Sequence, residues 1–186
     1  MAQQLIVTIL GTDQTGILSE IAKLVSENHC NILDSRQAVY GKEFSLTMII
    51  EGTQPAITRV ECSVPAFCQQ FDLLSMMKRT SQHEKQNLEV LLDVEFSGVD
   101  AAGLISTVSR FFAERSASIS AFRQKTFPCP STGNEMMRCK LVVNIPQKGN
   151  VENVTDEFTD LLTTLGLDGK ITVKHQKDSH EHATSW

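Results

Sequence analysis

An internal repeat is the feature that most constrains this chain, because it requires one small fold that can be used twice. The segment VTILGTDQTGILSEIAKLVSENHCNILDSRQ aligns without a gap on the later segment VEFSGVDAAGLISTVSRFFAERSASISAFRQ. A constant offset of 87 residues places Gly16 on Gly103 and Arg36 on Arg123. Self-similarity at a fixed spacing indicates a duplicated structural unit, so a fold inferred for one half must also suit the other.

Each copy shows the same succession of hydrophobic patterns. From Leu88 to Phe96, apolar residues alternate with mostly polar ones, which is the period of a strand with one buried face. The helix after the Gly-x-Asp-x-x-Gly turn has one apolar stripe at the spacing i, i+4, i+7, i+8, and the two stripes are Ile17, Ile21, Leu24 and Val25, then Leu104, Val108, Phe111 and Phe112.

The remaining elements follow in the same order in both halves. We expect strands at 32–40 and 44–51, a helix at 56–71 and a strand at 73–79, and, in the second copy, 118–127, 136–145, 151–165 and 170–174. Pro65 is expected to kink or restart its helix, because proline lacks the N–H that an interior helical position donates.

The order βαββαβ predicts the fold class: α+β, with two ferredoxin-like units in tandem and two helices on one face of each sheet. The expected units are 1–80 and 88–175, joined by the polar linker 81–87 and followed by a flexible tail at 176–186. Because each unit alone has a limited core, we expect the two to pack together.

Composition and charge exclude several classes of function. The net charge is -5 and no cluster of Lys and Arg appears along the sequence, so direct DNA binding is not expected. No apolar run of about 18 residues is present, so no helix is expected to span a membrane.

The five cysteines form no C-x-x-C pair, which indicates a reduced, cytoplasmic protein without a disulfide framework or a zinc site. Cys30, Cys62 and Cys139 are expected to act as small core residues. No histidine recurs in both copies and no nucleophile can be paired with a base, so we expect no metal, no cofactor and no enzyme activity.

The loop GTDQTG is the most informative segment. Gly11 and Gly16 are expected to form tight turns that let a ligand approach the backbone. Unpaired N–H groups at the helix start favour a carboxylate, and Asp13 can bind an ammonium group, so the loop suits a small amino acid. The alternative is that Asp13 and Asp100 only cap their helices. The spacing also resembles a phosphate loop, but its Lys-Ser/Thr pair is absent.

The candidate site therefore combines this loop with the start of the next strand, which we expect to lie nearby. The candidate ligand-binding residues of the first copy are Gly11, Asp13, Gly16, Ile17, Asn31 and Asp34. The second copy offers Gly98, Asp100 and Gly103 as weaker equivalents, because Ser118 and Ala121 replace Asn31 and Asp34 there.

A strand, the Gly-x-Asp-x-x-Gly turn, an apolar helix and then Asn31-Ile32-Leu33-Asp34 resemble the ACT-domain family, and the resemblance covers about residues 1–175. The family usually carries Arg-Pro after the Asp, whereas this chain has Gln14-Thr15 and Ala101-Ala102. The resemblance implies that small amino acids bind where two units pair.

Two ACT units without an attached catalytic or DNA-binding domain are similar to transcriptional regulators. That similarity implies a repressor that contacts an activator protein and is relieved by glycine. A homo-oligomer is a further expected assembly. The alternative is a regulatory subunit or dimerisation module of an amino-acid or folate metabolic enzyme.

Overall fold

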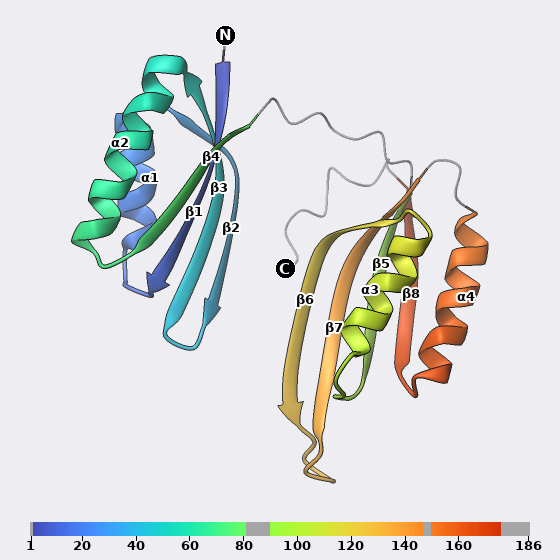
Figure 1. Ribbon diagram of the computed structural model, residues 1–186. Helices are drawn as coiled ribbons and strands as arrows, with labels where there is room; N and C mark the ends of the chain where they lie inside the picture. Colours follow the sequence, from blue (N-terminus) through green and yellow to red (C-terminus); the bar gives the residue numbers. More distant parts are fainter. Residues whose placement is uncertain (1, 81–89, 147–149, 176–186) are drawn as a thin grey trace. The chain divides into compact units, whose positions relative to one another are not determined.

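The computed structural model describes residues 2–80, 90–146 and 150–175, which form two compact units that divide near residue 84. Each unit is a four-stranded antiparallel sheet with two helices on one face (Figure 1). The predicted fold class is confirmed, with the order βαββαβ repeated in both units. The predicted linker 81–87 and tail 176–186 lie outside the described residues.

The first unit has the sheet order β2-β3-β1-β4. Alternate residues of β1 and β3 face the helices and are buried, as the alternation predicted. The apolar stripe of α1 and one face of α2 cover them. The elements are β1 (Ala2–Thr12), α1 (Ile17–Glu27), β2 (Asn31–Tyr40), β3 (Glu43–Thr53), α2 (Gln54–Gln70) and β4 (Leu74–Thr80).

The second unit repeats this arrangement with the order β6-β7-β5-β8. Its core is aromatic: Phe112 and Phe158 have ring centroids 4.8 Å apart, and Phe111 lies 5.2 Å from Phe158. Its elements are β5 (Val90–Val99), α3 (Leu104–Glu114), β6 (Ser118–Pro128), β7 (Glu135–Ile145), α4 (Val151–Thr164) and β8 (Asp168–His175).

An irregularity in strand pairing recurs at the same place in both units. The register shifts between Ile32 and Asp34 in β2, and between Ile119 and Ala121 in β6. An extra residue in an edge strand increases its local twist and changes which face its side chains occupy. The shared position of this bulge, 87 residues apart, supports the duplication inferred from the sequence.

The second helix of the first unit differs from its prediction. Of the two expected effects of Pro65, a kink or a restart, the restart does not occur, because α2 runs through Pro65 without interruption. Proline removes one hydrogen bond, but Val60, Val64 and Cys68 keep the same face buried on both sides of it. The helix also begins earlier than predicted, because the Thr53 side chain accepts a hydrogen bond from the Ala56 N–H at 3.4 Å.

Gly11 was expected in a turn, and the structure places it instead inside β1, opposite Phe44. A Cβ atom on Gly11 would lie 2.5 Å from Leu73 Cδ2 and 3.3 Å from the carbonyl oxygen of Asp72. Gly98 has the same environment, with Leu167 Cδ2 at 2.5 Å from such a Cβ. Glycine is therefore required here by the close approach of the chain that enters the last strand.

Replacing Gly11 by alanine should lower the free energy of unfolding by about 1–3 kcal/mol, since overpacking a fixed site costs this much. Chemical denaturation of the purified protein measures the loss. Leu73→Ala alone should also destabilise, because Leu73 is buried in the core, but the two losses should combine less than additively, since removing the Leu73 side chain makes room for the new Cβ. An unchanged stability for Gly11→Ala would contradict the close approach.

The cysteines occupy more varied environments than the sequence indicated. Cys139 is buried as expected, and so is Cys68, but Cys30 is only partly buried. The prediction for Cys62 is wrong, because this residue is exposed on the outer side of α2. Burial raises the pKa of the Cys139 thiol to about 11.

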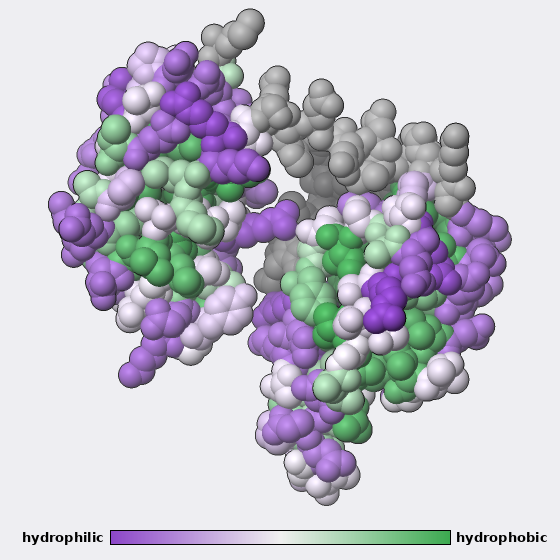
Figure 2. Space-filling view, in the orientation of Figure 1, coloured by the Kyte–Doolittle hydropathy of each residue, from purple (hydrophilic) through white to green (hydrophobic). Residues whose placement is uncertain are grey.

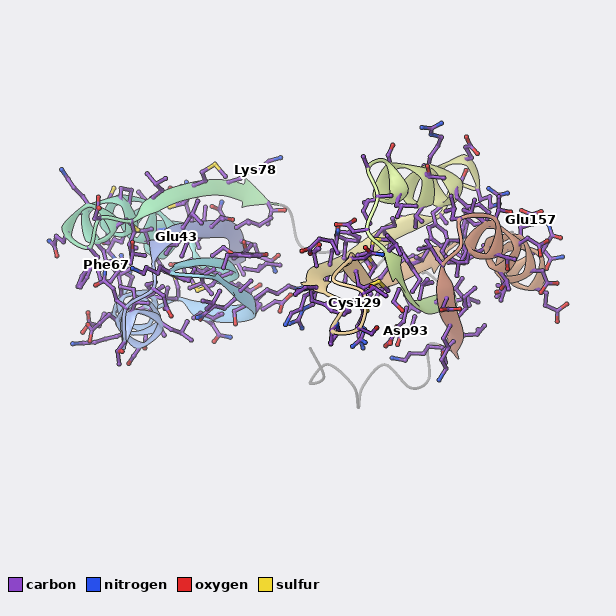
Figure 3. All side chains as sticks on the ribbon, turned by 90° about the horizontal axis from the view of Figure 1, so that it is seen from below. Glu43, Phe67, Lys78, Asp93, Cys129 and Glu157 are labelled. Atoms are coloured by element: carbon purple, nitrogen blue, oxygen red, sulfur yellow. The ribbon has the colours of Figure 1, made fainter. Side chains whose placement is uncertain are left out.

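Cys129 stands at the start of the loop between β6 and β7, where Figure 3 labels it. Its Sγ atom lies 3.2 Å from the Ser131 hydroxyl. Hydrogen bonds from Ser131 and Thr132 stabilise the thiolate and lower the pKa of Cys129 to about 6. Near neutral pH this thiol is therefore largely ionised, whereas that of Cys139 is not.

Iodoacetamide should therefore modify Cys129 at a rate that rises through pH 6 and levels off above pH 7, because the thiolate is the nucleophile. Cys139 should stay unmodified in the folded protein. Mass spectrometry of peptides from a pH series measures both rates, and exposed Cys62 is the internal control. A Cys129 profile that is still rising at pH 8, like that of an ordinary thiol, would contradict the stabilised thiolate.

No helix in the described residues is long and apolar enough to cross a membrane. Large apolar side chains are nevertheless exposed in both units, and green patches mark apolar surface on each in Figure 2.

Candidate functional site

Two hydrogen bonds to other elements hold the loop that follows β1. The Asp13 N–H donates to the carbonyl oxygen of Lys42 at 2.8 Å, which attaches the loop to the turn between β2 and β3. On the other side, Gln14 Nε2 donates to the carbonyl oxygen of Phe71 at 3.2 Å. The loop is thus fixed between the β2–β3 turn and the segment that precedes β4.

Helix α1 begins at the end of this loop with free backbone donors. Gly16 is its N-cap residue and has φ 88°, a left-handed conformation that favours glycine. The Ile17 N–H donates to the Gln14 carbonyl at 3.1 Å, and the Glu20 N–H donates to the Gly16 carbonyl at 3.1 Å. The N–H groups of Leu18 and Ser19 have no acceptor in the described part of the chain, so they can bind an anion.

The structure does not support the interpretation of Asp13 as a helix cap. Neither α1 nor α3 has a side-chain cap, and their N-cap positions are held by Gly16 and Gly103. An Asp caps a helix from the N-cap position itself, whereas Asp13 precedes that position by three residues. Its exposed side chain forms no hydrogen bond or ion pair with any residue that the structure describes. The Asp13 carboxylate is therefore available to a ligand.

The second loop has the same backbone conformation, but its Asp carboxylate already accepts a hydrogen bond. The Asp100 N–H donates to the Glu135 carbonyl at 2.8 Å, and Gly103 has φ 88°, as in the first unit. However, the Thr126 hydroxyl donates to Asp100 Oδ2 at 3.2 Å. The residue that matches Thr126 in the first unit is Val39, which cannot make this bond. The two loops are alike in shape and differ in the availability of their acidic group.

Asn31 and Asp34 were expected near the loop, and within one unit this is wrong. Asn31 pairs with Glu51, which pairs with Gln4, so these residues lie at the end of the sheet where β1 begins. The loop follows the other end of β1, beyond Gly11, about 23 Å away at about 3.3 Å per residue. The reason is that α1 carries the chain back along the sheet before β2 starts.

The side chains at this far end also differ between the units. Asn31 is exposed, and Asp34 Oδ2 lies 3.9 Å from Arg36 Nε in a long, solvent-exposed ion pair. In the second unit Asn144 Nδ2 donates to the Ser118 hydroxyl at 3.3 Å. The Oδ1 atom of Asn144 is buried without a hydrogen-bond partner among the described residues, whereas the Asn31 side chain is exposed to solvent.

The contacts that fix the loop were not predicted. Their acceptors are backbone carbonyl groups, which every residue has, so the sequence does not reveal them. Two side chains beside the loop were also missed. Thr12 Oγ1 donates to Glu43 Oε1 at 3.4 Å, and Leu18 is 45% exposed on the first turn of α1. Figure 3 shows Glu43 at the end of the sheet near this loop.

Comparison with known proteins places this fold in a family. The sequence profile of the ACT domain matches residues 3–78. The glycine cleavage system transcriptional repressor of Escherichia coli (strain K12) is 29% identical over 177 residues, covering 95% of this chain and 93% of that protein.

Two solved structures share the complete tandem arrangement. A crystal structure provisionally assigned as a glycine cleavage system transcriptional repressor is 35% identical, with a TM-score of 0.73, and the match covers 95% of this chain and 99% of that one. A protein of unknown function from Galdieria sulphuraria has a TM-score of 0.74 at 18% identity over 94% and 99% of the two chains, which shows the shared fold alone.

The resemblance seen in the sequence is thereby confirmed, and with it the expectation of a regulatory protein rather than an enzyme. The chain belongs to the ACT-domain family, as a tandem ACT protein similar along nearly its whole length to the glycine cleavage system transcriptional repressor.

Proposed function

We propose that this protein is an amino-acid-responsive repressor of the glycine cleavage system, which acts by contact with an activator protein and is relieved by glycine. The observation that carries the proposal is the free carboxylate of Asp13 in the loop that leads into α1, whose first turn has the free N–H groups of Leu18 and Ser19. The name of the Escherichia coli relative supports the choice of system. The free cysteines are consistent with a cytoplasmic location, where thiols stay reduced.

The loop matches the chemistry of a small amino acid zwitterion. Asp13 can accept hydrogen bonds from the ammonium group, while the first turn of α1 donates to the carboxylate. Gly16 contributes no side chain, and a Cβ there would meet no atom within 4 Å, so space is open beside the helix start. Ile17 is buried below the loop and holds the helix start on the core.

The size of glycine limits the affinity that such a site can reach. Glycine has about five heavy atoms, and a ceiling of ~1.5 kcal/mol per atom gives at most ~7.5 kcal/mol. This corresponds to a dissociation constant of a few μM at best, and we expect tens of μM to mM. Such an affinity suits a sensor of an abundant metabolite.

Asn31 and Asp34 can complete this site only if a second copy of the chain supplies them. Asn31 lies at the opposite end of its own sheet, and Asp34 is aligned through Ile49 with Ile6 near the middle of β1, about 17 Å from Gly11 at about 3.3 Å per residue. The edge strand β2 that carries them also exposes Leu33 (46%) and Val39 (52%). An exposed apolar edge strand has unpaired backbone groups that can pair with a strand of another chain. We therefore include a homo-oligomer in the proposal.

Calorimetric titration with glycine tests the site. Replacing Asp13 by alanine should weaken binding by about tenfold or more, since a charge-assisted hydrogen bond contributes about 1.5–3 kcal/mol. Asp100→Ala is the matched control in the second loop and should change the affinity by less than about twofold, because its carboxylate is already bonded to Thr126.

Equal losses from the two substitutions, or no heat with glycine up to several mM for the wild type, would refute the assignment. If Asp13→Ala only lowered the melting temperature and left the affinity intact, Asp13 would have a structural role alone.

A further inference from the structure

The pairing of β6 with β7 assembles a basic surface that is not visible along the sequence. Arg123 lies directly opposite Lys140, and Lys125 lies directly opposite Arg138. All four side chains are exposed, on the face of the sheet away from the helices, since the intervening Cys139 is buried under them. We call these four residues the basic face.

Like charges placed directly opposite each other on a sheet are destabilising, so the basic face costs stability. Lys140 is neutralised by Glu95, with Nζ 2.6 Å from Oε1. The other three cations take part in none of the ion pairs found in the described ranges. Arg138 lies 5.8 Å above the ring of Phe127, a distance at which a cation–π contact is weakly favourable.

The scaffold does not require these charges, because the first unit has the same topology without them. The matching pairs in the first sheet are Arg36 opposite Thr47 and Ala38 opposite Ser45. One cation therefore stands where the second unit has four. A costly feature that the fold itself does not need points to a binding role.

We propose that the basic face docks an acidic segment of a partner protein. Three cations without a partner anion provide the charge complementarity, and the two guanidinium groups can bind carboxylates through paired hydrogen bonds. Because β6 is an edge strand, an extended segment can also reach its unpaired backbone groups while its acidic side chains lie over the basic face.

The same surface is less suited to nucleic acid. Asp93 and Glu95 lie on this face in the central strand β5, but Lys174 and Lys140 neutralise them, so they do not decide between phosphate and carboxylate ligands. Figure 3 shows Asp93 on the side of the sheet away from Glu157 of α4. Single-stranded nucleic acids usually stack on aromatic side chains, and Phe127, on the edge strand, is the one aromatic residue of this face in the described strands.

This inference rests on the proposed function only in taking the partner to be a protein. It concerns the second unit, whereas the glycine site lies in the first. Loss of acidic-peptide binding with retention of glycine binding, or the reverse, would therefore separate the two proposals.

Fluorescence anisotropy of the full chain with a labelled peptide of about ten glutamates tests the basic face at low ionic strength, where charge interactions are least screened. Reversing two cations in Arg123→Glu/Arg138→Glu should weaken binding by about tenfold or more. The neutral Arg123→Gln/Arg138→Gln pair should give a smaller loss in the same direction. Salt should weaken wild-type binding.

The matched control is Arg36→Glu/Lys78→Glu, which makes the same change of charge on the corresponding face of the first unit. It should weaken peptide binding much less than Arg123→Glu/Arg138→Glu does, because these two residues are not part of the basic face and contribute only to the overall charge of the chain. Circular dichroism and glycine titration verify that each variant is folded.

Equal losses in the control would show that only the overall charge matters and would overturn the proposal. Absence of peptide binding at low salt would do the same. The same anisotropy assay is repeated with labelled duplex DNA and with labelled single-stranded RNA. Tighter binding of either than of the peptide, lost on Arg123→Glu/Arg138→Glu, would assign the face to nucleic acid instead.

Discussion

Burial of one face of each sheet under two helices is the constraint on which the rest of this protein depends. Alternation along the strands places apolar residues such as Val7 and Val94 under the helices, and the core of each unit consists of that layer. The fold therefore requires apolar residues at only about half of the strand positions, those that face the helices. The loops before the helices and the open faces of the sheets remain free to differ between the two copies, and the differences in exposed polar and charged groups lie there.

The two units have diverged at those positions while the backbone has stayed the same. Gly16 and Gly103 share φ 88°, and both loops are attached through the N–H of their Asp residue. Yet Asp13 is free, whereas Asp100 accepts a hydrogen bond from Thr126. In our account the first unit senses the metabolite and the second carries the contact surface, so that one duplicated scaffold provides both parts of a regulator.

The fold could be predicted from the sequence because repeat and alternation are local patterns, whereas the site depends on relations that the sequence does not display. Asn31 lies far from the loop because α1 carries the chain back along the sheet before β2 begins. The Asp13 carboxylate is free because the first unit has Val39 at the position of Thr126, the residue whose hydroxyl binds Asp100 in the second unit. The basic face was missed because Arg123 and Lys140 are separated by a whole hairpin, and only the register brings them together. Pro65 did not end its helix because packing on both sides outweighed one lost hydrogen bond.

The central claim is that the loop of the first unit is the metabolite sensor, and an amide NMR titration of the full chain with glycine tests it most directly. The account predicts that the largest shifts occur at the free N–H groups of Leu18 and Ser19 and at Gly16, with small shifts at Ile105 and Ser106 in the matching positions of the second unit. Shifts of equal size in both loops, or shifts that avoid the start of α1, would contradict it.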